Sequence, residues 1–174
     1  MKHQHPWQAR LAVAIIMLLL AFLGMVVTDI RTTGGFDYWK WIVPVYALLA
    51  LWLSWYSRRQ NKDALSPTTL WHELLHWIGL GLSVFLVSFF VDLGSLSRFN
   101  AGLVNLTLLA LTVYLAGIYI ESTFLFIGLI IGLFAMLAAF LVQYLYAISI
   151  PLLLGSILII FLWVWISHRK TTTK

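Results

Sequence analysis

The segment His72-Glu73-Leu74-Leu75-His76 combines residue types at a spacing that could do chemistry. On a helix, residues four apart share a face, so His72 and His76 could hold one metal ion between their imidazole rings. Glu73 would then lie beside a metal-bound water and act as its base. The segment therefore predicts a zinc site at which water is activated for hydrolysis.

Such a site needs a third protein ligand. The orientation derived below leaves two candidates on the same side of the membrane, Glu121 between two predicted helices and His168 at the end of the last one. With His72 and His76, either residue would complete the metal's ligand set. Both also have ordinary roles, since Glu121 begins a helix and His168 complements the dipole at a helix C-terminus.

Over these five residues the chain resembles membrane-embedded zinc proteases, including the site-2 and CAAX-processing types. The resemblance implies His72 and His76 as zinc ligands and Glu73 as the catalytic base. The chain's only Asp-Leu-Gly, at residues 92–94, bears a loose likeness to the aspartate element of site-2 proteases. It lies on the same predicted helix as His76, roughly 24 Å away at 1.5 Å per residue, so Asp92 cannot complete the site.

The composition predicts that lipid surrounds most of the chain. Of its 174 residues, 62% are hydrophobic and 10% are charged, against roughly 45–50% and about 25% in soluble domains. The absence of cysteine excludes disulfides, thiolate zinc sites and cysteine nucleophiles. The net charge of +5 lies in short clusters at the ends of apolar runs, which argues against a nucleic-acid partner.

Six apolar runs are close to the roughly 20 residues that a helix needs to cross a bilayer core. We therefore expect an all-α fold, a single transmembrane domain over residues 1–174 with six membrane-spanning helices. Residues 122–167 carry no charge, and Ser149-Ile150-Pro151 predicts a break between the last two helices because proline suits a helix's first turn. The predicted spans are approximately 11–28, 39–57, 68–91, 101–120, 123–147 and 151–167.

The basic residues predict the orientation of these spans. If the N-terminus is cytoplasmic, eight of the eleven Lys and Arg residues face the cytoplasm, as the positive-inside rule requires. Six spans place both termini on that side, which predicts a multi-pass protein of the inner (plasma) membrane. The eight residues are Lys2, Arg10, Arg58, Arg59, Lys62, Arg169, Lys170 and Lys174.

Two further groups of residues predict packing and polar contacts. Gly128, Gly132, Ala135 and Ala139 share one helix face, which favours close packing inside the bundle and leaves a homodimer open. A second group is predicted at or near the non-cytoplasmic end of the bundle, where its members would either close the bundle or form the mouth of a cavity for a polar solute. This group consists of Asp29, Asp92, Asn105 and Gln143.

These observations support two hypotheses about function. The first is a non-catalytic membrane protein without a cofactor, acting as a solute-handling module or as a membrane subunit of a larger complex. Its partners would be the lipid bilayer and other membrane proteins or a second copy. In size and helix number it is similar to small substrate-capture modules of transporters. The second hypothesis is an intramembrane, peptidase-like metallohydrolase with zinc at a cytoplasmic-side site.

Overall fold

The computed structural model describes residues 6–30, 36–61 and 67–171, all but a few of them helical. Side chains are described for all of these except residues 6, 60, 61, 67–69, 145–147, 149, 150, 153 and 160–171. The helices are α1 (Pro6–Ile30), α2 (Asp37–Asn61), α3 (Pro67–Asp92), α4 (Arg98–Tyr119) and α5 (Thr123–Thr171). The all-α prediction is confirmed.

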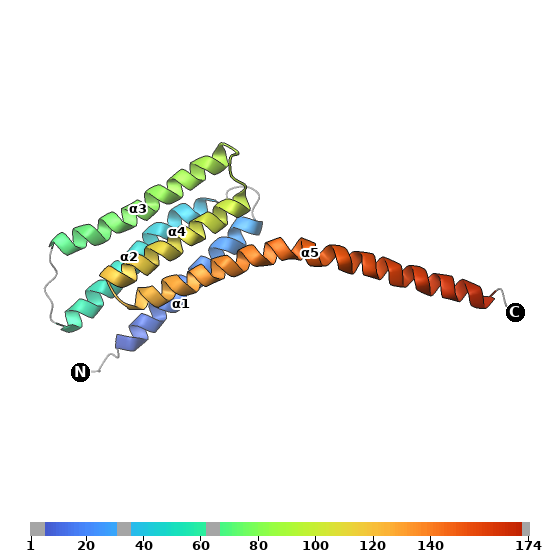
Figure 1. Ribbon diagram of the computed structural model, residues 1–174. Helices are drawn as coiled ribbons and strands as arrows, with labels where there is room; N and C mark the ends of the chain where they lie inside the picture. Colours follow the sequence, from blue (N-terminus) through green and yellow to red (C-terminus); the bar gives the residue numbers. More distant parts are fainter. Residues whose placement is uncertain (1–5, 31–35, 62–66, 172–174) are drawn as a thin grey trace. The chain divides into compact units, whose positions relative to one another are not determined.

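The chain divides into two compact units, Met1–Ala135 and Met136–Lys174. In the first unit α1 packs on α2, α2 on α3, α3 on α4, and α4 back on α1 (Figure 1). Helices that follow one another run in opposite directions, so this ring is an up-down-up-down bundle. One end of the ring therefore gathers the start of α1, the end of α2, the start of α3 and the end of α4.

Four stretches in the described part of the chain are long and apolar enough to cross a membrane: Trp7–Ile30, Leu70–Asp92, Arg98–Tyr119 and Thr123–Tyr144. Large apolar side chains such as Leu19, Phe22, Leu82 and Phe85 are exposed on the outside of the bundle. A soluble surface does not carry contiguous apolar area on this scale. The fold therefore has the character of a membrane protein.

Polar side chains inside the bundle mostly bind backbone carbonyls or one another. Thr28 donates to the carbonyl oxygen of Gly24 at 2.7 Å and accepts from the indole N–H of Trp39 at 2.8 Å. The hydroxyl of Tyr46 donates to the carbonyl oxygen of Met17. In lipid each such group needs an internal partner, so these bonds hold α2 against α1.

The predicted break at Ser149-Ile150-Pro151 is wrong, because all three residues are helical within a continuous α5 of 49 residues. The six predicted spans thus fall on five helices. A proline removes only one helical hydrogen bond, and in apolar surroundings the neighbouring residues still gain most by staying helical. Pro44 lies inside α2 in the same way.

Candidate functional site

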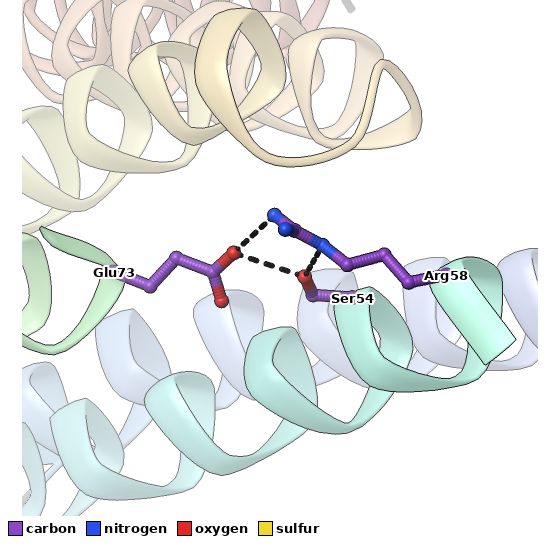
Figure 2. Close-up of polar contacts among 3 residues, drawn as sticks. All are labelled: Ser54, Arg58 and Glu73. Atoms are coloured by element: carbon purple, nitrogen blue, oxygen red, sulfur yellow. Dashed lines mark hydrogen bonds and ion pairs between the residues drawn. The ribbon is translucent and has the colours of Figure 1, made fainter. Parts of the chain in front are cut away.

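A buried ion pair joins α2 to α3 at the end of the bundle defined above. Arg58, in the last turns of α2, donates from Nη2 to Oε1 of Glu73 at 2.7 Å (Figure 2). The hydroxyl of Ser54 donates to the same Oε1 at 3.0 Å and accepts from Nε of Arg58 at 3.2 Å. The three side chains form a closed triangle in which Ser54 is both donor and acceptor.

The other carboxylate oxygen of Glu73 is left without a partner. The Glu73 side chain is only 4% exposed, and its Oε2 is buried with no hydrogen bond among the described residues. A buried acceptor that has lost its water costs free energy until a donor reaches it. Glu73 lies in the second turn of α3, where the helix dipole also favours its negative charge.

The ring of His76 is fixed by a hydrogen bond to α4. Its Nε2 lies 2.9 Å from the carbonyl oxygen of Thr112. A carbonyl oxygen only accepts, so Nε2 carries the proton, and in the neutral ring Nδ1 keeps its lone pair. The indole of Trp77 meets the His76 ring edge to face, with 5.5 Å between centroids. The His76 ring is therefore held against α4 with Nε2–H as its donor.

A cavity of about 390 Å³ lies between α3 and the end of α4. Small-molecule sites typically have volumes of about 300–1,000 Å³ and a few polar groups on mainly apolar walls. On the α3 side it is lined by all three polar residues of the sequence motif, and the opposite wall is largely apolar. The lining residues are His72, Glu73, His76, Ala116, Tyr119 and Ile120.

Glu121 has a partner of its own. Its Oε1 lies 2.9 Å from Nη2 of Arg10 in α1 and accepts a longer hydrogen bond, 3.5 Å, from the hydroxyl of Thr123. Arg10 also reaches the hydroxyl of Ser57 at 3.5 Å. The ion pair between Arg10 and Glu121 thus joins α1 to the connection between α4 and α5. The side chain of His168, the other predicted third ligand, lies outside the described residues.

The residues predicted for helix packing fall in both units. A Cβ on Gly128 would lie 2.4 Å from the backbone nitrogen of Tyr114, so α5 lies directly against α4 at this point. Gly132 faces the methyl of Ala110 with ordinary spacing, and Ala135 is buried. Ala139 belongs to the second unit and is exposed.

The residues predicted near the non-cytoplasmic end do not share one environment. Asp29 and Asp92 are exposed, and so is Gln143, which belongs to the second unit. Asn105 is instead completely buried in α4, and neither its amide oxygen nor its nitrogen has a partner among the described residues. Asn105 therefore lies in the core, apart from the two exposed aspartates.

The polar groups that line the cavity are the rings of His72 and His76, the carboxylate of Glu73 and the hydroxyl of Tyr119. Among the side chains that the structure describes, which do not include His168, no group of three His, Asp or Glu residues is arranged to hold a metal ion. One carboxylate oxygen of Glu73, Oε1, accepts hydrogen bonds from Arg58 and Ser54, and that side of the carboxylate therefore faces α2. The cavity therefore has hydrogen-bonding side chains on a mainly apolar wall, as the site of a small polar ligand would.

Comparison with known proteins adds no family to this description. No protein-family model matches the chain, and no curated protein and no solved structure is significantly similar to it. The functional argument accordingly rests on the site itself.

Sequence reasoning missed both partners of the acidic groups. It placed Arg10, Arg58, Glu73 and Glu121 on the same side of the membrane, yet it did not pair them. Opposite charges on neighbouring antiparallel helices at a common depth were the available signal, because an intramembrane charge seeks a partner.

Proposed function

We propose that the protein is a non-catalytic, multi-pass protein of the inner (plasma) membrane that binds a small polar solute in the cavity between α3 and α4. The observation that carries this proposal is the cavity's lining, in which the polar side chains of His72, Glu73 and His76 lie together on one wall. Polar groups at membrane depth are costly and are kept where they serve a pathway or a site.

The predicted orientation is part of the proposal. Arg10, Arg58 and Arg59 lie on helix segments that meet at one end of the bundle. The positive-inside rule then favours the cytoplasm for this end, for the cavity and for both chain termini. Six spans, two of them on α5, remain our proposal for how the 174 residues cross the bilayer.

Because the natural chain has no cysteine, a single introduced thiol can test water access to the cavity. In membrane vesicles, His76→Cys is expected to react with a charged, membrane-impermeant thiol reagent about tenfold faster or more than Leu75→Cys does. Leu75 is the more exposed residue, but its side chain would face lipid, which excludes a charged reagent. The measurement is the labelling rate by mass spectrometry.

Two exposed serines serve as controls for sidedness, since Ser95 lies between α3 and α4 and Ser122 between α4 and α5. Ser122→Cys should react from the same face of the membrane as His76→Cys, and Ser95→Cys from the other face. Equal rates for His76→Cys and Leu75→Cys would show that the cavity is dry and would overturn the proposed function.

Zinc hydrolysis is a second candidate, and one observation favours it. A histidine that ligates a metal usually donates its other ring N–H to a carbonyl or carboxylate, and His76 donates to Thr112 in this manner. Glu73, however, would have to act as a base while Arg58 and Ser54 hold its Oε1. The non-catalytic function is therefore the better supported of the two.

Metal analysis of the purified protein distinguishes these candidates. We expect well below one zinc per chain in the natural protein, and the same low content in the His72→Ala/His76→Ala double variant. The reason is that the described residues present no set of three ligands. One zinc per chain in the natural protein, lost in the double variant and on dialysis against a chelator, would instead support the hydrolase.

Partner proteins or a second copy belong to the proposal as well. Described side chains of α5 from Met136 to Ile159 are nearly all exposed and apolar, as the surface of a helix covered by lipid or by another helix would be. Such a surface suits a membrane subunit that docks on a larger complex.

A further inference from the structure

We propose that one exposed face of α2, close to the C-terminal end of that helix, binds an anionic phospholipid. The residues of this aromatic–arginine face follow one another at the i, i+3, i+4, i+7 spacing of a single helix face. None of them lines the α3–α4 cavity, so the lipid site is separate from the proposed function and does not depend on it. The residues are Trp52, Trp55, Tyr56 and Arg59.

The aromatic–arginine face is accessible, and its side chains are arranged by contacts with one another. Trp52 is 46% exposed and Trp55 40%, and Arg59 is exposed as well. The rings of Trp52 and Tyr56 are stacked, with 5.5 Å between centroids and 14° between planes. The guanidinium carbon of Arg59 lies over the ring of Trp55, 5.2 Å from its centroid. A ligand at this face would therefore meet ordered rings and a positioned cation.

Arg59 is a cation that no described carboxylate neutralises. Its neighbour Arg58 points into the bundle and pairs with Glu73, whereas Arg59 contacts only the ring of Trp55 among the described residues. A guanidinium carries five N–H donors, and a cation–π contact gives them no oxygen acceptor. Arg59 therefore keeps donors and charge for an external anion.

The polarity of this side of α2 changes along the helix in the same order as the polarity of a phospholipid. Val45 and Leu48 are exposed and apolar, and the indoles of Trp52 and Trp55 come next. Tryptophan prefers the headgroup level of a bilayer. Arg59 lies seven residues beyond Trp52, or about 10 Å further along the helix axis. An acyl chain would then contact Val45 and Leu48 while the phosphate reaches Arg59.

Charge complementarity selects an anionic lipid. Arginine donates paired N–H groups to phosphate oxygens, and these charge-assisted bonds are stronger than neutral ones. A zwitterionic headgroup brings its own cation close to its phosphate, so it offers Arg59 less net attraction. Phosphatidylglycerol has the phosphate without that cation. Basic side chains near a membrane surface attract such lipids for the same reason.

Native mass spectrometry of the full chain tests the site. Protein freed of lipid in a maltoside detergent is titrated with phosphatidylglycerol, or with phosphatidylcholine that has the same acyl chains, and the dissociation constant of the first bound lipid is measured. Phosphatidylglycerol is expected to bind about tenfold more tightly, the equivalent of one charge-assisted hydrogen bond. Arg59→Ala should remove this preference by weakening phosphatidylglycerol about tenfold while leaving phosphatidylcholine nearly unchanged.

Lys40→Ala is the matched control for charge. Lys40 is an exposed cation near the other end of α2, and it already pairs with Asp37 at 3.2 Å. Its removal should leave the affinity for phosphatidylglycerol unchanged. Equal losses for Lys40→Ala and Arg59→Ala would show that net charge governs binding, and would overturn the proposed site.

The ring under Arg59 gives a second, independent test. Trp55→Leu should weaken phosphatidylglycerol about threefold, because the arginine loses its cation–π contact, and should add little in the Arg59→Ala background. Trp41→Leu, at another exposed tryptophan near the start of α2, should have no effect. Fully additive losses for Trp55→Leu and Arg59→Ala would contradict a joint site.

Two other occupants are distinguished in the same spectra. Glycerol 3-phosphate has the phosphate but no acyl chain and should not displace the bound lipid; displacement would make the ligand a soluble phosphate compound and overturn the proposal. A second copy of the chain on this face would appear as a dimer that Trp55→Leu dissociates. That result would also overturn the lipid site.

Discussion

Replacing Arg58 with alanine is expected to lower the free energy of unfolding by about 3–5 kcal/mol, the cost of removing one partner of a buried ion pair. Arg58 is 22% exposed and Glu73 only 4%, so the carboxylate would stay buried with the hydroxyl of Ser54 as its remaining donor. Unfolding of the detergent-solubilised protein, followed by circular dichroism, measures the loss.

The neighbouring Arg59 is the matched control. It is exposed, and its guanidinium lies 5.2 Å from the ring centroid of Trp55. Arg59→Ala removes the same charge and about the same volume, but only an exposed cation–π contact of about 0.5–1 kcal/mol. The double variant Arg58→Met/Glu73→Met should recover much of the loss, because it leaves no unpaired charge. Equal losses for the two arginines would show that the pair contributes nothing specific.

Gly128→Ala is expected to destabilise the bundle by about 1–3 kcal/mol, the usual cost of forcing an extra carbon into a packed contact. The new Cβ would lie 2.4 Å from the backbone nitrogen of Tyr114 and 2.7 Å from the carbonyl oxygen of Ala110. Both are backbone atoms of α4 and cannot turn aside as a side chain does, so α4 and α5 must separate. The same unfolding measurement applies.

Gly132→Ala tests whether this loss is caused by contact with α4. Gly132 lies one turn further along α5, and a Cβ there would meet only the methyl of Ala110, at 3.8 Å. Alanine also favours a helix over glycine by about 0.8–1.0 kcal/mol. Gly132→Ala should therefore leave the stability unchanged or raise it. Similar losses for both substitutions would refute the close approach at Gly128.

The helices could be predicted from the sequence because the length of an apolar run is set by the bilayer itself. The predicted spans 11–28, 39–57, 68–91 and 101–120 lie within α1 to α4 or reach one residue beyond. The helix ends were less predictable. Helical hydrogen bonds continue past the apolar core, so α1 begins at Pro6 and α2 reaches Asn61.

The candidate site could be predicted in part. Helical spacing alone brings His72, Glu73 and His76 to neighbouring positions, and all three line the cavity. The hydrogen bond from Nε2 of His76 to the carbonyl oxygen of Thr112 could not be predicted from the sequence, because it depends on how α4 lies against α3. The partner of Glu121 could not be predicted either. The sequence allowed its carboxylate to face the histidines, whereas in the structure it pairs with Arg10.

The two ion pairs differ greatly in the length of chain between their partners. Arg58 and Glu73 are 15 residues apart and can meet as soon as α2 and α3 are side by side. Arg10 can pair with Glu121 only after α4 has been synthesised, because Glu121 follows α4 in the chain. Since a growing chain folds from its N-terminus onward, Arg10 lacks this partner until α4 and the connection after it have been made. We therefore expect the ion pair between α2 and α3 to form first during synthesis, and the ion pair that closes the ring of four helices to form last.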